Sequence, residues 1–222
     1  MKQHTITLPG GYKSPDPKAN GAVGRSVTFG RRPTLAERVK IDDDAQSSIE
    51  VQKTLLLARA AITSFEGVRR NPVPLSALLQ LEETDREVLL EGYLEYLRGS
   101  LGDGVAEQLD ENTFKLALGL EVDGETYDLI EFTPEPKPLS GYDEVKLERQ
   151  FGAGVRKDVA LISREAVALA QSEGDLRLDR PVEVELLERL DAYDGIELLK
   201  FFADRRASFR RHRRATACGT GQ

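Results

Sequence analysis

The sequence predicts an α+β protein, predominantly helical, with two tandem repeats that each consist of a short β-hairpin followed by three to four helices. Three observations lead to this fold class: a long stretch recurs, turn signals precede each copy, and helical periodicity fills most of the rest. The expected boundaries are 1–104 for the first repeat, 105–208 for the second, and 209–222 for a basic, flexible tail.

The recurrence is clearest at the end of each half. The stretch PVPLSALLQLEETDREVLLEGYLEYLRG, which begins at Pro72, aligns without gaps with PVEVELLERLDAYDGIELLKFFADRRAS, which begins at Pro181. The order of elements before this stretch also agrees between the halves, so one fold is expected to be built twice. The identical pairs are Pro72/Pro181, Val73/Val182, Leu78/Leu187, Leu81/Leu190, Asp85/Asp194, Leu89/Leu198 and Leu90/Leu199.

In the first half, two short strands are expected, the first of them ending at the turn signal Pro9-Gly10-Gly11. The Pro- and Gly-containing segment 13–24 predicts a mobile loop. Thr34 and Glu37 have the spacing of a capping box and predict the start of a helix. The expected strands are 5–8 and 26–29, and the expected helices are 34–42, 48–65, 75–81 and 84–97.

In the second half, Asp123-Gly124 lies between two stretches that favour strands, which is the strongest short signal for a hairpin. Ser140 precedes Asp143 and Glu144, a pattern typical of a helix start. The expected strands are 114–122 and 126–132, and helices are expected from 140, over 158–170, and as a pair from 181 onward.

Composition limits the class of protein. The chain has 222 residues, of which 40% are hydrophobic, and a formal net charge of -7, which argues against a general nucleic-acid binder. A single cysteine, Cys218, cannot form a disulfide within the chain, so an intracellular compartment is expected. No signal peptide is expected, because the N-terminus has no apolar h-region, and no membrane span is expected, because no apolar run reaches about 18 residues. The expected location is the cytoplasm.

Catalytic residues, cofactor-binding residues and metal ligands are not predicted. The only histidines, His4 and His212, lie near the chain ends, where order is least expected. The acidic run 42–44 could attract a divalent cation, although a solvated acidic turn is the favoured interpretation. Asp85 and Asp194 stand at the start of the last helix of each half and are interpreted as helix caps. A non-enzymatic protein is therefore expected.

Apolar helix faces and the arginine-rich end remain as candidate binding surfaces. A surplus apolar face could form a groove for a partner helix, and the arginines could contact acidic or phosphate groups. Nucleic acid is the less favoured partner, and self-association is left open. The candidate partner-binding residues are Leu75, Leu78, Leu79, Leu186, Leu187, Arg205, Arg206, Arg210 and Arg211.

Short motifs resemble a known group of proteins. In the second half, LEVDGETYDLIEFTPEPKPLSGYDEVKLERQ within 119–150 resembles the tail assembly chaperones of Mu-like tailed phages, which start with a hairpin around a Val-Asp-Gly-like turn. In the first half, ITLPGGY, VTFGRRPTLAER and TDREVLLEGYLEYLRG resemble the same plan. They also resemble the small base-plate assembly proteins of contractile phages. This chain differs in its long 13–24 loop and in carrying two units.

The resemblance implies a non-enzymatic assembly protein of a phage tail or related contractile particle. It implies binding to the tape-measure protein or to baseplate hub or tail proteins, as a chaperone or adaptor in the host cytoplasm. One alternative is a permanent structural component of the baseplate, hence of the virion. A second alternative is a regulatory nucleic-acid-binding protein that uses its arginine-rich end.

Overall fold

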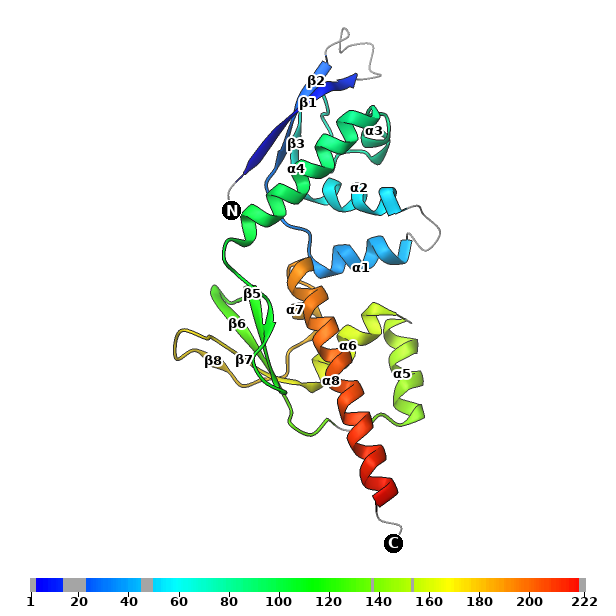
Figure 1. The fold of residues 1–222 in the computed structure, drawn as a ribbon, viewed down its shortest axis with the longest axis vertical. Coiled ribbons are helices and arrows are strands. Elements are labelled where there is room, and N and C mark those ends of the chain that lie inside the picture. Colours follow the sequence, from blue (N-terminus) through cyan, green and yellow to red (C-terminus); the bar gives the residue numbers. More distant parts are fainter. Residues whose placement is uncertain (1–2, 14–22, 45–49, 137, 153, 220–222) are drawn as a thin grey trace. The chain divides into compact units, whose positions relative to one another are not determined.

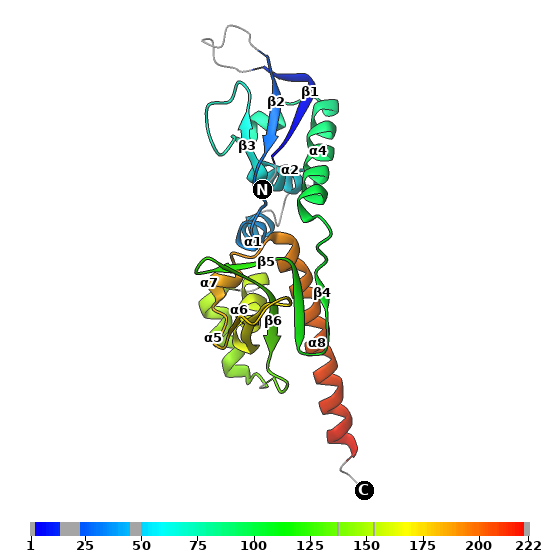
Figure 2. The same ribbon diagram turned by 90° about the vertical axis from the view of Figure 1, so that its left-hand side faces the viewer.

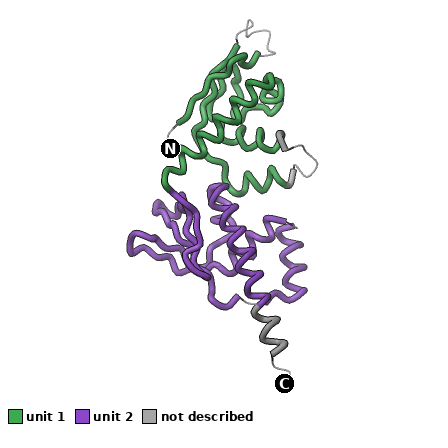
Figure 3. Tube along the Cα trace, viewed as in Figure 1, with its two compact units in different colours: residues 1–103 green, residues 104–222 purple. Residues whose placement is uncertain are grey.

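The computed structural model describes residues 3–13, 23–44, 50–136, 138–152 and 154–219, and it describes side chains in these ranges except at 43–51 and 212–219. The chain divides into two compact units, residues 1–103 and 104–222 (Figure 3). This division falls one residue before the boundary expected from the repeat.

The first unit is an antiparallel sheet of strand order β1-β2-β3 with helices packed against it (Figure 1). Helix α4 runs alongside β1 and contacts it closely, and α2 contacts α1, α3 and α4 (Figure 2). Its elements are β1 (His4–Lys13), β2 (Val23–Phe29), α1 (Leu35–Asp44), α2 (Glu50–Ala61), β3 (Ile62–Phe65), α3 (Leu75–Leu79) and α4 (Glu83–Leu101).

The second unit repeats this order and adds a strand at each edge of its sheet, giving the antiparallel order β4-β5-β6-β7-β8. Helix α8 contacts β5 and α6, as α4 contacts β1 and α2. Its elements are β4 (Glu107–Gln108), β5 (Thr113–Val122), β6 (Glu125–Phe132), α5 (Gly141–Phe151), α6 (Val155–Glu165), β7 (Ala166–Ala170), β8 (Arg177–Leu178), α7 (Val184–Leu187) and α8 (Ala192–Gly219).

The predicted fold class is wrong in its emphasis on helices. Helices make up 47% of the structure, and the rest includes two sheets of 3 and 5 strands. Each unit contains a third strand, β3 or β7, that pairs with the second strand of the hairpin. The units are therefore sheets covered by helices, and not hairpins followed by helices alone.

The third strands were missed because each continues directly from a helix. Ala61 ends α2 and Ile62 begins β3, while Glu165 ends α6 and Ala166 begins β7. Apolar side chains keep a helix-like spacing across both junctions, so periodicity extended the helices through 65 and 170. Periodicity cannot distinguish a short buried strand from helix, and the β-branched Ile62 was the better signal.

The predicted turn at Pro9-Gly10-Gly11 is instead a β-bulge inside β1. Pairing with β2 is interrupted between Thr7 and Tyr12, and pairing of β5 with β6 is interrupted at the corresponding place, between Lys115 and Leu120. Both bulges contain a glycine with positive φ, 73° at Gly11 and 76° at Gly119. This conformation favours glycine and bends the first strand of each unit.

The predicted capping box at Thr34 and the predicted helix cap at Ser140 are both confirmed. The backbone N–H of Glu37 donates to Thr34 Oγ1 at 3.3 Å, and the N–H of Thr34 donates to the Glu37 carboxylate at 3.0 Å. Ser140 and Asp143 make the same reciprocal pair at the start of α5. These bonds satisfy amides that a helix start leaves unpaired. The hairpin at Asp123-Gly124 is also confirmed, with positive φ at both residues.

Two segments, the 13–24 loop and the C-terminal tail, were expected to be mobile. The expected flexible tail from 209 is helical as far as Gly219, because α8 continues to that residue. Residues 14–22 of the expected mobile loop lie outside the described residues. No helix in the described part of the chain is long and apolar enough to cross a membrane.

Candidate functional site

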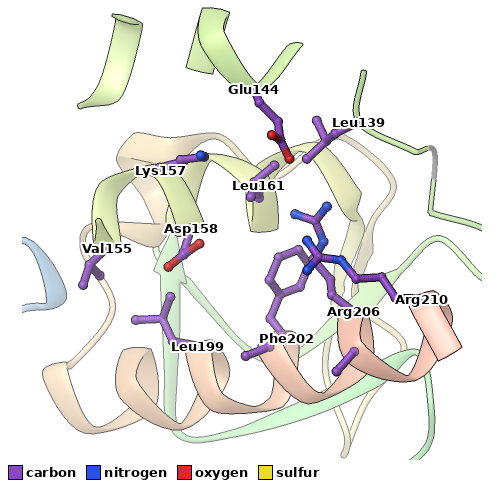
Figure 4. Close-up of a pocket in the computed structure, with 12 residues that line it drawn as sticks. Leu139, Glu144, Val155, Lys157, Asp158, Leu161, Leu199, Phe202, Arg206 and Arg210 are labelled. Carbon is purple, nitrogen blue, oxygen red and sulfur yellow. The ribbon is translucent and has the colours of Figure 1, made fainter. Parts of the chain in front are cut away.

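A cleft in the second unit lies between α8 on one side and α5 and α6 on the other (Figure 4). Its volume is about 410 Å³, and it has an apolar floor with charged groups around it. Seven lining residues are apolar, three are cationic and two are acidic. They are Leu139, Val155, Leu161, Leu199, Phe202, Ala203, Ala207, Lys157, Arg206, Arg210, Glu144 and Asp158.

The cations of the cleft come mainly from α8. Arg206 and Arg210 are one helical turn apart, and Figure 4 shows both guanidinium groups in the cleft, with Glu144 on the opposite wall. The Arg206 guanidinium lies over the Phe202 ring, 5.8 Å from its centroid. Within the described residues, neither Arg206 nor Arg210 forms an ion pair. Both are therefore available to a carboxylate or phosphate of a ligand.

The acidic groups of the cleft are unequal. Asp158 keeps contact with solvent, yet desolvation by the cleft walls raises its pKa, opposed by the nearby charges of Lys157 and Arg206. Lys157 is held by Glu148 through an Nζ–Oε1 contact of 2.6 Å, and this bond raises the pKa of Lys157. The lining contains no hydroxyl, thiol or imidazole, so its chemistry suits binding of an apolar segment that carries a negative charge.

A second cavity of about 390 Å³ borders α8 where it faces β4, and Arg205 forms part of its wall. The Arg205 guanidinium is buried and bonds Glu165 Oε2 at 2.6 Å. It also donates to the backbone oxygens of Glu111 and Thr133 and to the Asn112 side chain. Burial lowers its pKa, opposed by Glu165. Arg205 is therefore a structural residue, unlike the neighbouring Arg206.

The predicted partner-binding residues fall into buried and exposed groups in the structure. Leu78, Leu186 and Leu187 are buried in their units, so a partner cannot reach them without unfolding. Leu75 is half-buried, and only Leu79, at 46% exposure, is open to solvent. Of the arginines, Arg206 and Arg210 line the cleft, Arg211 is exposed, and Arg205 is withdrawn into the core.

The two candidate caps bind the bulged strands. Asp194 accepts the N–H groups of Ala117 and Leu118 at 2.7 and 3.0 Å, and Asp85 accepts the N–H of Gly10 at 2.9 Å. Both aspartates are fully buried in the first turn of the last helix. The N-cap of α4 is Glu82, without a side-chain cap bond. The Asp85 carboxylate therefore ties α4 to β1, which corrects the cap interpretation.

In the described part of the chain, the histidines and the acidic run 42–44 do not come together with other polar side chains to form a site. His4 lies in β1 with its ring 6.5 Å from that of Phe29, and the His212 side chain is outside the described residues. In the 42–44 run, Asp42 pairs with Arg38 at 2.8 Å. Among the described residues, no group of three or more His, Cys, Asp or Glu side chains is placed to hold a metal ion.

Sequence reasoning identified the α8 arginines but missed the opposite wall of the cleft. Glu144, Lys157 and Asp158 lie on helices whose charged positions look like ordinary solvent faces. Lys157 and Asp158 share α6 with buried apolar residues, whereas α5, which carries Glu144, buries none of its residues and offered no such signal. Comparison with known proteins adds no constraint, since no family model, no curated protein and no solved structure matches the chain.

Proposed function

We propose that the protein is a non-enzymatic assembly protein that holds a segment of another protein in the α5–α6–α8 cleft. The supporting observation is the composition of that cleft: an apolar floor of Leu161 and Phe202 beside the cations Arg206 and Arg210. An apolar helix that carries a carboxylate complements both parts, since arginine forms strong paired bonds to carboxylates and helices bury apolar faces in such grooves.

The two aspartates shared by the repeats support a binding role. In an enzyme built by duplication, Asp85 and Asp194 would be the natural candidates for acid–base chemistry. Both are instead engaged with backbone amides of the bulged strands. The residues that the two units have in common therefore maintain the fold, and the charged groups of the cleft belong to the second unit.

The resemblance of both halves to phage tail assembly chaperones gives the proposal its biological setting. In that setting the bound segment belongs to a tape-measure protein, or to a hub protein of the baseplate, before the tail is complete. A long apolar helical protein needs such cover, and a duplicated unit suits it. The protein acts as a chaperone or adaptor and leaves when assembly ends.

Co-expression with a tape-measure protein from the same genome, followed by affinity capture, tests this function. The wild-type protein is expected to capture the tape measure. The double variant R206E/R210E is expected to lose capture by about tenfold or more, because reversed charges repel the bound carboxylate.

The matched control is R98E, which reverses an exposed arginine on α4, the corresponding helix of the first unit. It is expected to capture as the wild type does. Mass spectrometry of purified particles separates a chaperone, which is absent from them, from a baseplate component. Failure to capture either tape-measure or hub proteins would refute the assembly role, whereas equal loss in R98E and R206E/R210E would refute only the cleft.

A further inference from the structure

The sheet edges of the two units differ. In the second unit, β5 is covered by β4, with Glu107 opposite Lys115 and Gln108 opposite Phe114. In the first unit, β1 is the corresponding strand, and within the described residues of that unit no strand pairs with its outer edge. The two strands align through their bulges, which places Ile6 at the position of Phe114 and Thr7 at the position of Lys115.

Backbone N–H and C=O groups of β1 point away from β2, as the corresponding groups of β5 show. In β5, the oxygen of Thr113 accepts from Leu109 N–H on the β4 side, whereas the oxygen of Asn112 accepts from Phe132 N–H on the β6 side. Backbone direction alternates along a strand, so Lys115 also faces β4. By the same alignment, Thr5 and Thr7 of β1 face away from β2 with their N–H and C=O groups.

The residues from His4 to Leu8 carry none of the devices that usually protect an edge. This part of β1 has no lysine, arginine, aspartate, glutamate or proline before Pro9. The added edge strands of the second unit, in contrast, carry Glu107 and Arg177. An uncharged edge with regular alternation is a ready template for another strand.

The helix beneath the edge leaves room for an added strand at Gly99. Gly92, Glu95 and Gly99 of α4 occupy the positions that Phe201, Asp204 and Ser208 of α8 occupy beside β4. Gly92 is buried against Ile6, but a Cβ at Gly99 would meet nothing within 4 Å, so the helix surface is open at Gly99. The Glu95 side chain is 67% exposed and lies 3.6 Å from His4 Nε2. The open part of the edge is therefore bordered by a glycine and one carboxylate.

We propose that the β1 edge binds an extended segment of a partner protein, which adds to the sheet as β4 adds to β5. The segment pairs with Thr5 and Thr7 and places a basic side chain next to Glu95. Its backbone provides the affinity, and the charge facing α4 provides selectivity. This site lies in the first unit and does not depend on the cleft of the second.

Synthetic peptides based on the β4 sequence test the proposal against the full-length protein. The probe is VAEKLDEN, the sequence 105–112 with lysine at the position of Gln108, which lines the α8 side of β4. We expect it to shift the NMR signals of the Thr5 and Thr7 amides and to protect them from hydrogen exchange. VAEELDEN, with glutamate at that position, is expected to bind about tenfold more weakly.

Methylated peptides give the matched control. An N-methyl group on the first glutamate amide, which faces the edge strand, is expected to reduce binding by about tenfold, whereas methylation of the lysine amide, which faces away, leaves it unchanged. T7P removes the corresponding donor of the protein and is expected to weaken binding similarly, with its thermal unfolding as the check on folding.

Two results would overturn the proposal. One is equal binding of the lysine and glutamate peptides together with equal effects of both methyl groups, which would mean that no strand is added. The other is a dimer of the protein without peptide that T7P abolishes, because a second copy would then be the occupant of the edge.

Discussion

The two buried aspartates occupy the same place in the two units but have unequal partners. Asp194 uses its two oxygens on two amides, those of Ala117 and Leu118. Asp85 uses one oxygen on Gly10, and its Oδ2 atom is buried without a hydrogen-bond partner among the described residues. The alignment of the bulges places Pro9 opposite Ala117, and proline has no N–H to donate.

A residue that is repeated in the sequence therefore need not make the same interactions in both units. The identity of Asp85 and Asp194 in the sequence reflects a shared tie between the last helix and the first strand. Its strength depends on a second residue, more than 70 positions away, that the units do not share. The aspartate of the second unit bonds two strand amides, whereas the aspartate of the first unit bonds one.

A second difference lies in the cores. The second unit buries the Glu165–Arg205 pair at 2.6 Å. The corresponding positions of the first unit, at the end of α2 and on α4, are Ala61 and Tyr96, both buried. One unit therefore depends on charge compensation where the other depends on apolar packing, and the two should respond differently to truncation.

The largest expected effect comes from breaking the buried ion pair. E165A leaves the Arg205 charge uncompensated, so the second unit should lose about 3–5 kcal/mol of unfolding free energy. Urea denaturation followed by circular dichroism measures the loss. The double variant E165A/R205A should cost less than the sum of the single variants, since the two side chains act as a pair. A loss below about 1 kcal/mol for E165A would contradict the assigned role.

The next effect distinguishes the two aspartates. D194N places an amide NH2 group against a strand N–H and should destabilise the second unit by about 2–4 kcal/mol. D85N puts its NH2 group where Oδ2 has no partner and keeps an oxygen for Gly10, so it should change stability by less than about 0.5 kcal/mol. Equal costs in urea denaturation would show that the two ties are equivalent after all.

Pro9 supplies the control for this pair. P9A restores an N–H at the position of Ala117, and that N–H can donate to the free oxygen of Asp85. In the P9A background, D85N should therefore become destabilising, by about 1–2 kcal/mol. If D85N stays neutral in that background, the missing amide is not the cause of the difference.

The smallest effect concerns the two capping boxes at low pH. Burial acts to raise the pKa of Glu37, but hydrogen bonds from Arg31 and Thr34 outweigh it and lower the pKa below 4.5. Hydrogen bonds from Ser140 lower the pKa of Asp143 below 3.8. Because both folded pKa values are depressed, each cap is complete above the ordinary value and is lost as the pH falls through the folded value.

NMR titration of the Thr34 and Ser140 amides measures these losses. The Thr34 signal should change with a midpoint below pH 4.5 and the Ser140 signal with a midpoint below pH 3.8. A midpoint at or above the ordinary value at either amide would show that its cap does not stabilise the charged carboxylate.

Local signals predicted local structure. Thr34 with Glu37 and Asp123-Gly124 were interpreted correctly because the relevant bonds and dihedral angles lie within a few residues. The third strands were missed because Ile62 and Ala166 follow a helix without a break, and the β-branched Ile62 was a weak local signal beside the pairing with a distant strand that defines them. The helical emphasis of the predicted fold class follows from this error.

The sequence indicated which kinds of residue could bind a partner, but not which individual residues are exposed to do so. Leu78 and Leu79 are neighbours with the same chemistry, yet one is fully buried and the other is 46% exposed. Arg205 and Arg206 are likewise neighbours, and Arg205 is withdrawn from the surface by partners that lie far from it in the sequence, among them Glu165, 40 residues earlier. Sequence periodicity cannot supply such distant information.

The aspartate ties also set an order of events. Each joins residues near the two ends of its own unit, 75 positions apart for Asp85 and Gly10 and 77 for Asp194 and Ala117. During synthesis, the first tie can close only after the first turn of α4 has left the ribosome, and the second only after the first turn of α8 has done so. Contacts of such long range slow folding, so each unit completes late and the first completes before the second.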